Sequence, residues 1–353
     1  MKHLTAIDLF SGVGGLSLGF QQQGIEIEYA NEYDPGIANS YAKNHQTTNV
    51  DSRDITKIDI SKTFSPYRNG ISIVMGGPPC QGFSQKVKRI GLDDERNYMF
   101  KYFFEVINTV DPDVAILENV PNIISAYDGK FTEQILTLFD KMGFEVDFGL
   151  LNAEEFGVPQ IRRRAFFLAA RRGRLSKIDL PIPTNLRTTV HQAISDLPRL
   201  NSGEGQEVSS YHSEPDSRYQ KIMRRHSKQL HNHVATNHSK LALERLSHID
   251  ETQAMLDLPI ELQTKSIYSG TWSRIPRDGF ARTITTRFDT PSSGQFTLYD
   301  QDRCLTVREA ARIQSFPDTY IFHGNKSSQM LQVGNAVPPI LGAALAKEIL
   351  ANY

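Results

Sequence analysis

Short apolar runs alternate with longer segments whose apolar residues recur every three to four positions across the first 170 residues. The short, β-branched runs predict buried strands, and the longer periodic segments predict amphipathic helices. The predicted strands are Thr5–Phe10, Glu26–Glu32, Ile71–Met75, Val114–Leu117, Phe144–Leu151 and Ala165–Ala169. The predicted helices run from Leu16 through Phe20, and over residues 34–43, 98–110 and 131–142. This alternation predicts an α/β fold built on a doubly wound, mostly parallel sheet.

The pattern changes at about Arg171, where prolines and polar residues replace clean periodicity. Regular order returns at Thr306–Glu309, a capping-box sequence that predicts a helix running on through Phe316 and stopped by Pro317. A last helix is predicted over residues 340–350, after Pro338-Pro339. The chain is therefore expected to consist of two domains, or of one large domain with an irregular insertion.

The composition is that of an ordinary soluble protein, with 39% hydrophobic and 22% charged residues. No apolar run is long enough to span a membrane and no signal peptide is recognisable, which predicts a cytoplasmic protein with no membrane partner. The two cysteines, Cys80 and Cys304, lie far apart in the sequence. They argue against a disulfide framework and against a cysteine-based zinc site.

Charge is distributed unevenly although the whole chain has a formal net charge of −1. Residues 1–159 carry a net charge of −9, residues 160–245 carry +9, and residues 246–353 carry −1. A basic middle segment is typical of a protein that binds a polyanion, and nucleic acid is the first candidate. The alternative is a solvated basic face without a partner.

Candidate chemistry begins with the sequence Gly76-Gly77-Pro78-Pro79-Cys80-Gln81-Gly82-Phe83-Ser84. It follows a predicted buried strand, so the Cys80 thiol is expected at the carboxyl edge of the sheet, where ligands bind in open α/β folds. The two prolines fix the turn that carries the thiol, and the glycines permit close approach. A small buried cysteine is the alternative, but packing alone does not require this surrounding sequence.

A glycine-rich turn, Phe10 to Gly15, joins the first predicted strand to the first helix. Together with Glu32, at the end of the second strand, it suits a nucleoside ligand whose ribose hydroxyls donate to the carboxylate. Ser17 stands where a dinucleotide-binding sequence has its third glycine, which favours a ligand without a pyrophosphate. Tyr33 could stack on an adenine and Asp54 could accept from its amino group, or both could be ordinary surface residues.

Two further sequences lie at predicted strand ends. Glu118-Asn119-Val120 should border the edge that carries Cys80, where a carboxyl group can act as a general acid or bind a ring nitrogen. If Gln160-Ile161-Arg162-Arg163-Arg164 is extended, Arg162 and Arg164 share one face and present two guanidinium groups. The alternative for the second sequence is an exposed basic edge strand.

In this order, these motifs resemble those of the cytosine-C5 DNA methyltransferases, and the resemblance covers nearly the whole chain. Phe10–Gly15 matches the family's cofactor turn, Pro79-Cys80-Gln81 its nucleophile motif, and Glu118–Val120 its Glu-Asn-Val triplet. Gln160–Arg164 matches its Gln-x-Arg-x-Arg motif, and residues 303–318 and 334–339 match its last two motifs. The resemblance implies a Rossmann-like methyltransferase domain with a smaller, irregular target-recognition domain.

The resemblance also implies the reaction and its site. S-adenosylmethionine is expected as the methyl donor, S-adenosylhomocysteine as the product, and cytosine C5 in a specific sequence of double-stranded DNA as the acceptor. Cys80 is expected to add to C6 of a flipped-out cytosine, with Glu118, Arg162 and Arg164 as the other catalytic residues. The same motifs imply the cofactor-binding residues Phe10, Gly12, Val13, Gly14, Glu32, Ile55, Pro79, Met99, Asn335 and Val337. Tyr33 and Asp54 join this set as candidates from their positions after the strands.

The expected domains are a catalytic and cofactor-binding domain over residues 1–180, a target-recognition domain over residues 181–300, and a returning segment over residues 301–353. The loop from Ser84 to Asn97 is expected to close over DNA as a lid. Residue types that contact bases and phosphates give the predicted DNA-binding set. This set is Gln81, Ser84, Lys86, Arg89, Trp272, Arg274, Arg282, Thr285 and Arg287.

Other interpretations remain open at this stage. An RNA (tRNA) cytosine-C5 methyltransferase would use the same fold, and a non-catalytic nucleic-acid-binding module or a nucleotide-binding dehydrogenase is a third possibility. His226, His231, His233 and His238 match no zinc spacing, so no metal is expected and solvated or DNA-facing histidines are favoured. The protein is expected to be a monomer, with functional pairing to a restriction endonuclease as a further hypothesis.

Overall fold

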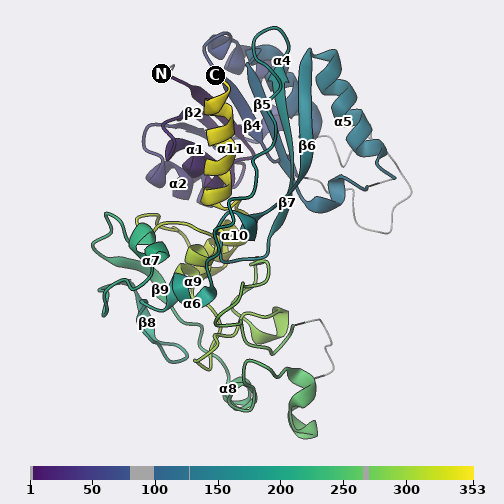
Figure 1. The fold of residues 1–353 in the computed structure, drawn as a ribbon. Helices are drawn as coiled ribbons and strands as arrows, with labels where there is room; N and C mark the ends of the chain where they lie inside the picture. The colour runs from purple at the N-terminus through teal and green to yellow at the C-terminus, as the bar shows by residue number, and fades with distance from the viewer. Residues whose placement is uncertain (1–2, 80–98, 127, 265–269) are drawn as a thin grey trace. The chain divides into compact units, whose positions relative to one another are not determined.

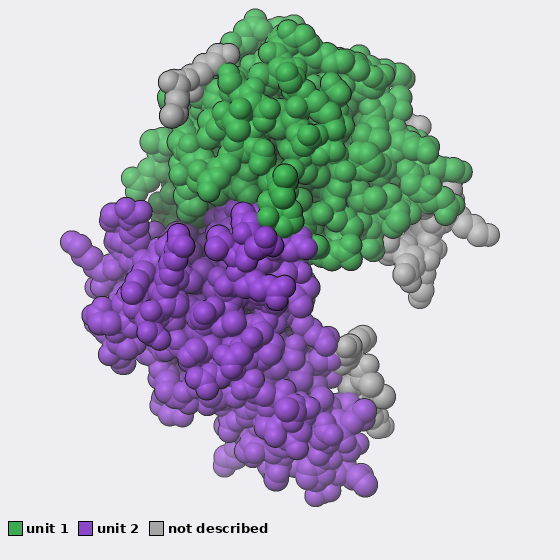
Figure 2. Space-filling model, viewed as in Figure 1, with its two compact units in different colours: residues 1–152, 163–183, 341–353 green, residues 153–162, 184–340 purple. Residues whose placement is uncertain are grey.

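The computed structural model describes residues 3–79, 99–126, 128–264 and 270–353 (Figure 1). The chain divides into two compact units, coloured separately in Figure 2. Unit 1 comprises residues 1–152, 163–183 and 341–353, and unit 2 comprises residues 153–162 and 184–340. Ten residues before β7 therefore belong to unit 2. The chain returns to unit 1 at residue 163 and, after the long second segment of unit 2, again at residue 341.

Unit 1 is built on a mixed sheet, with seven strands among the described residues in the order β3-β2-β1-β4-β5-β7-β6. The strands are β1 (Thr5–Leu9), β2 (Glu26–Asn31), β3 (Asn49–Asp51), β4 (Ile73–Gly76), β5 (Val114–Asn119), β6 (Phe144–Asn152) and β7 (Arg163–Arg171). Strands β1 to β5 pair in parallel, whereas β7 pairs antiparallel with both β5 and β6. The predicted doubly wound, mostly parallel α/β sheet is confirmed.

The helices of unit 1, except α3, lie where periodicity predicted them. They are α1 (Gly15–Gln21), α2 (Pro35–Asn44), α3 (Ile60–Phe64), α4 (Met99–Val110), α5 (Lys130–Lys141) and α11 (Pro339–Ala351). Helix α2 begins at Pro35 because Asp34 caps it, accepting from the backbone N–H groups of Gly36 and Ile37. The sequence did not predict α3 or the three-residue strand β3, since both are too short to show a period.

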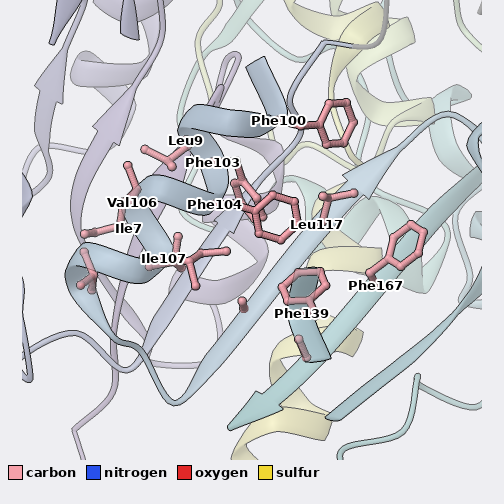
Figure 3. Close-up of a cluster of buried hydrophobic side chains, with 14 of the residues drawn as sticks. Ile7, Leu9, Phe100, Phe103, Phe104, Val106, Ile107, Leu117, Phe139 and Phe167 are labelled. Atoms are coloured by element: carbon pink, nitrogen blue, oxygen red, sulfur yellow. The ribbon is translucent and has the colours of Figure 1, made fainter. Parts of the chain in front are cut away.

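The main core lies on one face of the sheet, under α4 and α5. Alternate residues of the strands, such as Ile7, Leu9 and Leu117, point to this face, as a pleated strand requires. Helix α4 covers them with Phe100, Phe103 and other residues at helical spacing (Figure 3). The rings of Phe100 and Phe131 meet edge to face, with their centroids 5.2 Å apart. This packing fixes the sheet whose strand ends carry the candidate chemistry.

Helices α1 and α11 lie on the face of the sheet opposite the main core, and they contact each other at small residues. A Cβ atom on Gly342 of α11 would lie 3.0 Å from the carbonyl oxygen of Leu16 in α1, so a side chain there would push the two helices slightly apart. At the chain end, the Tyr353 hydroxyl donates to a carboxylate oxygen of Asp113 over 2.8 Å. The returning C-terminal helix is thus an integral layer of unit 1.

Unit 2 contains short elements joined by long irregular segments. They are α6 (Val190–Ile194), β8 (Gly205–Ser209), α7 (Arg218–Met223), β9 (Leu230–Val234), α8 (Lys240–Ser247), α9 (Val307–Ile313) and α10 (Lys326–Asn335). Strands β8 and β9 pair antiparallel as a separate two-stranded sheet. Buried ion pairs hold the unit together: Arg312 binds the carboxylates of Asp196 and Asp318, and Arg303 binds Glu309. The predicted functional domain boundaries remain a prediction.

The capping box predicted for α9 is present. The Thr306 hydroxyl accepts from the Glu309 N–H, and the Glu309 carboxylate accepts from the Thr306 N–H. The expected extension of the helix through Phe316 is wrong, because α9 ends at Ile313. Ser315 has φ 68°, so the left-handed backbone stops the helix before Pro317 is reached. Among the described residues, no helix is both long and apolar enough to cross a membrane.

Candidate active site

The site is organised by the reversal of strand order at β1. Strands β2 and β3 lie on one side of β1 and β4 and β5 on the other, so the helices that follow β1 and β4 diverge. A crevice forms outside the carboxyl ends of two such strands, and ligands of doubly wound folds bind there. The turn Phe10–Gly14 leaves β1 and the sequence Gly77–Pro79 leaves β4 at this place.

The turn after β1 has the backbone geometry of a ligand cradle. Phe10 and Gly12 both have φ 55°, and Gly14 has φ 88°, so three left-handed residues occur within five positions. A Cβ atom on Gly12 would meet nothing within 4 Å, which leaves the turn open for a ligand. A Cβ atom on Gly14 would lie 2.5 Å from Nε2 of His45, so this side of the turn is closed by packing. Val13 is buried between them.

Glu32, directly after β2, is bound to this turn. Its carboxylate accepts from the N–H of Gly12 over 2.9 Å and from the N–H of Asp34 over 2.8 Å. Burial raises the pKa of Glu32, and the two backbone N–H groups oppose that shift. Each carboxylate oxygen has a further lone pair after these bonds, so the group can still accept from ribose hydroxyls.

The other predicted cofactor residues of unit 1 surround this edge. The Tyr33 side chain is 69% exposed, which leaves its ring available for stacking. Asp54 caps a single turn of 3-10 helix at Ile55–Lys57, and its carboxylate accepts from the N–H and hydroxyl of Thr56. The hydroxyl bond lowers the pKa of Asp54. Ile55 is buried, and Met99, half-buried, begins α4.

The chain that leads to Cys80 lies directly against the end of β5. A Cβ atom on Gly77 would lie 2.8 Å from Oε2 of Glu118, so a side chain there would displace the Glu118 carboxylate. The Asn119 side-chain amide donates to the Pro78 carbonyl over 2.8 Å, a role that the sequence did not reveal. Pro79 is the last residue described before the gap. Cys80 itself, the predicted DNA-binding residue Gln81, and Ser84, Lys86 and Arg89 of the predicted lid lie outside the described residues.

Glu118 and Arg164 form a partly shielded ion pair at this edge. Nε of Arg164 lies 3.0 Å from Oε1 of Glu118, and both side chains are about one-seventh exposed, at 14% and 15%. The antiparallel pairing of β5 with β7 brings the two residues together, since it sets Glu118 opposite Phe166, two positions beyond Arg164. The sequence predicted both residues for the site, and the strand pairing places them in contact.

Arg162 does not present its guanidinium group on an open face. The side chain is fully buried in unit 2, where Nη1 donates to the Ile284 carbonyl and Nη2 to the Gly334 carbonyl. The expected face shared with Arg164 is not formed because β7 begins only at Arg163. Gln160 is buried as well, with its side-chain amide donating to Oε1 of Gln314 over 2.6 Å. These contacts indicate that Arg162 positions the surrounding backbone.

Asn335 is the last residue of α10, and Val337 lies two residues beyond it, both in unit 2. Asn335 is exposed, whereas 9% of the Val337 side chain is exposed. Beside them, a Cβ atom on Gly334 would lie 2.4 Å from the carbonyl oxygen of Thr285, so this sequence packs backbone to backbone. Their predicted contact with a cofactor remains a prediction.

The predicted DNA-reading residues of unit 2 divide into buried and exposed sets. Trp272 is 5% exposed and packs in an apolar cluster with Leu246 and Met255. The Arg274 guanidinium, also buried, donates to the carbonyls of Ile249, Leu246 and Leu298. We therefore correct the assignment of Trp272 and Arg274 to DNA contact, because their side chains hold the unit together instead.

The exposed set consists of Arg282, Thr285 and Arg287. Arg282 and Thr285 line a pocket of about 470 Å³ in unit 2, together with Thr283 and Gln295. Guanidinium and hydroxyl groups around an open pocket can bind phosphate oxygens or base edges. DNA contact by these three residues remains a prediction that their exposure permits.

Two of the four histidines singled out in the sequence, His233 and His238, have structural partners. His233 is buried, with its ring nitrogens 3.0 Å from the Thr306 hydroxyl and 2.8 Å from the Pro198 carbonyl. Nε2 of His238 accepts from the Cys304 N–H over 3.1 Å. The expectation of a solvated or DNA-facing side chain is therefore wrong for His233. Within the described part of the chain, no three His, Cys, Asp or Glu residues are grouped as metal ligands.

Comparison with known proteins decides the family. The C-5 cytosine-specific DNA methylase family matches residues 4–351. The chain belongs to the C-5 cytosine-specific DNA methylases. It is 35% identical to the type II methyltransferase M1.HphI of Haemophilus parahaemolyticus, over 98% of this chain and 87% of that protein. It is 34% identical to the type II methyltransferase M.DdeI of Desulfomicrobium norvegicum, over 98% of this chain and 88% of that protein.

Solved structures agree with the fold of this DNA methylase. A crystal structure of a DNA modification methyltransferase encoded within a prophage (E. coli) matches with a TM-score of 0.79 and 27% identity, covering 99% of each chain. The DNMT2 structure from Spodoptera frugiperda matches with a TM-score of 0.64 and 15% identity, covering 99% of this chain and 100% of that one. At that identity, the second likeness shows the fold alone.

Proposed function

We propose that this DNA methylase methylates C5 of a flipped-out cytosine in a specific duplex sequence through a covalent bond between Cys80 and C6. The observation that carries the proposal is the Glu118–Arg164 ion pair beside Gly77. It places a carboxyl group and a guanidinium group at the strand edge from which the chain runs to Cys80. The family, shown by the comparisons, supplies the reaction class.

Cytosine C5 is a weak nucleophile, so the reaction requires activation of the ring. The Cys80 thiolate adds to C6, forming a carbon–sulfur bond, and the electron pair of the C5–C6 double bond moves to make C5 nucleophilic. After methylation, a base removes the C5 proton and the electron pair restores the double bond as Cys80 leaves. Because C6 is inaccessible in stacked duplex DNA, the base must leave the helix first.

Glu118 and Arg164 are suited to stabilising the charge that develops during addition. The carboxyl group of Glu118 would bind or protonate N3 of the ring, while Arg164 would donate to the exocyclic O2. Their mutual contact over 3.0 Å keeps both side chains oriented before the base arrives. In this proposal Arg162, buried on the carbonyls of Ile284 and Gly334, acts by holding those backbone segments.

The residues around the turn after β1 suit S-adenosylmethionine, which supplies an electrophilic methyl group when bound. The turn at Gly12 is open, Glu32 keeps acceptor capacity for ribose hydroxyls, and the Tyr33 ring is exposed for stacking. The absence of a third glycine, with Ser17 in its place, agrees with a nucleoside that lacks a pyrophosphate. Val13 and Ile55 would give the site an apolar side.

Double-stranded DNA is the proposed macromolecular partner, contacted in unit 2 by Arg282, Thr285 and Arg287. The related type II methyltransferases suggest functional pairing with a restriction endonuclease, which we retain as part of the proposal. We propose a monomer acting in the cytoplasm. No observation favours the RNA methyltransferase alternative over DNA.

A trapping experiment tests the covalent step. A duplex containing 5-fluorocytosine at the target position should form a complex with the protein and S-adenosylmethionine that survives denaturation, because fluorine at C5 blocks the final elimination. The Cys80→Ala variant should form no complex and no methylated product. Cys304→Ala is the matched control, since Cys304 is the second cysteine and is fully buried in unit 2.

Two outcomes would contradict the proposal. Methyl transfer by Cys80→Ala at near wild-type rate would exclude attack by this thiol. Failure of active wild-type protein to be trapped would argue against addition at C6. A higher rate of transfer to tRNA than to duplex DNA would instead favour the RNA enzyme.

A further inference from the structure

A chain of buried polar groups runs beneath the glycine turn. The Tyr41 hydroxyl donates to the Ser17 hydroxyl over 2.7 Å, and the Ser17 hydroxyl donates to Oδ2 of Asp8 over 2.6 Å. These residues come from α2, α1 and β1, and their side chains are almost completely buried. Buried polar groups are costly unless they are satisfied, so this chain imposes one arrangement on three elements.

Asp8 belongs to the face of β1 opposite the main core. Its neighbours Ile7 and Leu9 point into the core under α4, and the pleat directs Asp8 toward α1. Ser17 is the third residue of α1. Its hydroxyl therefore binds this helix to β1, the strand that precedes the glycine turn. The glycine turn is thereby held at both ends by a single bond between its flanking elements.

Tyr41, the first residue of this hydrogen-bonded series, also packs against the glycine turn. The rings of Tyr41 and His45 lie with their centroids 4.2 Å apart. Both rings occupy the space that a Gly14 side chain would need, at 2.6 Å from Cε2 of Tyr41 and 2.5 Å from Nε2 of His45. Nδ1 of His45 lies 2.6 Å from Oε1 of Gln21, at the end of α1. No side chain caps α1 at Gly14, so this packing, and not a cap, sets the position of the helix start.

Other hydrogen bonds fix the turn at Ser11 and Gly12. Glu32 accepts from the Gly12 N–H, and the Ser11 N–H donates to the Asn31 carbonyl over 3.0 Å. Glu32 therefore binds the turn at Gly12, and the Tyr41 ring packs against it at Gly14. Ser17 connects Tyr41 to Asp8 of β1. A ligand that binds in a cradle fixed before binding loses less conformational entropy on association.

We propose that Ser17 is a positioning residue for S-adenosylmethionine: by joining Asp8 to Tyr41 it holds the Phe10–Gly14 turn in its ligand-binding conformation. This inference rests on the proposed function, since it assumes that the turn binds the methyl donor. Ser17 acts through the turn and does not touch the ligand. Its hydroxyl takes the place of the close helix–strand contact that a third glycine gives in dinucleotide-binding folds.

The inference predicts a change in cofactor affinity that is separate from the chemical step. Ser17→Ala should raise the Kd for S-adenosylmethionine, measured by calorimetry without DNA, by about tenfold, which is the effect of losing one to two buried hydrogen bonds. The KM for the cofactor should rise similarly while kcat changes less than twofold. Hydrogen exchange of the backbone amides at residues 11–15 should accelerate in the ligand-free protein.

Two other variants keep the test informative if Ser17→Ala folds poorly. Tyr41→Phe retains the ring that supports Gly14 but removes the hydroxyl, and it should reproduce a smaller part of the loss. Asp8→Asn retains a side-chain oxygen that can accept from Ser17, so it should bind the cofactor within about threefold of wild type. The double variant Ser17→Ala/Tyr41→Phe should lose no more affinity than Ser17→Ala, because both changes break one chain.

Failure of this inference is distinguishable from failure of the proposed function. If wild-type protein binds S-adenosylmethionine and folded Ser17→Ala binds it within twofold, with unchanged exchange at residues 11–15, the positioning role is wrong. An equal loss in kcat and in cofactor affinity would also overturn it, since a general structural defect gives that result. If wild-type protein does not bind the cofactor at all, the proposed function fails first.

Discussion

Carboxyl groups near the site differ in their properties because they are buried to different extents. Glu118 is partly shielded and paired with Arg164, whereas Asp8 is 2% exposed and has the Ser17 hydroxyl as a donor. Burial raises the pKa of Asp8 to about 7, and the nearby charges of Glu32 and Glu118 add to the shift. The fold therefore contains a carboxyl group whose charge changes near neutral pH.

The Asp8 pKa predicts how stability depends on pH. In the unfolded chain an aspartate loses its proton near its usual value of 3.8, while in the folded protein Asp8 keeps its proton up to about 7. Stability should thus fall as pH rises between these values and stay lower above them. Asp8→Asn should remove this loss, stabilising the protein at pH 8 by up to about 4 kcal/mol, with a gain that shrinks toward pH 4.

Urea unfolding at pH 4 to 8.5 measures this effect. Asp128→Asn is the matched control, because Asp128 is exposed and its positive φ of 57° suits asparagine equally well. A constant difference between Asp8→Asn and wild type over this pH range would show that Asp8 does not titrate there.

Glu118 gives a second prediction at this scale. Glu118→Gln keeps the size of the side chain and an oxygen for Arg164, but it loses the charge and the acidic proton. We expect kcat to fall at least about 100-fold, the usual contribution of general acid–base catalysis, with the cofactor Kd within threefold of wild type. Glu133→Gln, on the exposed face of α5, is the control. A larger effect on cofactor binding than on kcat would assign Glu118 a structural role.

At the scale of elements, close backbone contacts decide which glycines the site needs. Gly76 ends β4, and a Cβ atom there would lie 2.7 Å from the Leu9 carbonyl oxygen on β1. Gly334, inside α10, is closer still to Thr285 at 2.4 Å, and its carbonyl accepts from Arg162. These contacts are between backbone atoms, which cannot move aside as flexible side chains do.

Gly334→Ala tests this reasoning. In most helices a glycine-to-alanine change stabilises by about 0.5–1 kcal/mol, because alanine restricts the unfolded chain. Here the clash with Thr285 should reverse the sign and destabilise the protein by about 3 kcal/mol in denaturant unfolding. Ser327→Ala, on the exposed side of the same helix, should be neutral or slightly stabilising. A stabilised Gly334→Ala variant would mean that α10 can shift away from Thr285.

At the scale of the whole molecule, the basic segment offers fewer basic side chains to a partner than its sequence contains. Arg162 is buried on carbonyl groups, and several other basic side chains are paired with acids of unit 1. These pairs are Arg171 and Arg174 with Asp111, Arg172 with Asp140, and Lys177 with Asp147. The basic side chains available to DNA are therefore expected largely after residue 183.

Salt dependence measures the remaining electrostatic contribution. If Arg282, Arg287 and other exposed basic groups bind phosphates, DNA affinity should fall at least about 100-fold between 50 and 200 mM salt, because bound counterions are released. Arg282→Gln and Arg287→Gln should each flatten this slope. Arg172→Gln, whose partner is Asp140, is the matched control. A flat response in wild type would contradict the DNA-contact assignment for unit 2.

The sequence by itself determined the sheet, its main helices and the position of the candidate residues at the strand ends of unit 1. Strand and helix periods are local properties, and the motifs at Gly12, Glu32 and Glu118 occur directly at strand ends, so their shared edge follows from parallel pairing. The capping box at Thr306 was readable for the same reason. The stop at Ser315 was not, because a left-handed serine leaves no distinctive sequence signal.

Only the tertiary structure decided which polar side chains stay exposed and which hold the fold. Arg162, Trp272 and His233 have the residue types of a nucleic-acid surface, yet each is buried by segments distant in sequence. The reverse holds for Ser17, which looked like a missing glycine and proved to connect Asp8 with Tyr41. Residue type and spacing specify what a side chain can do, whereas its role depends on partners that only long-range packing supplies.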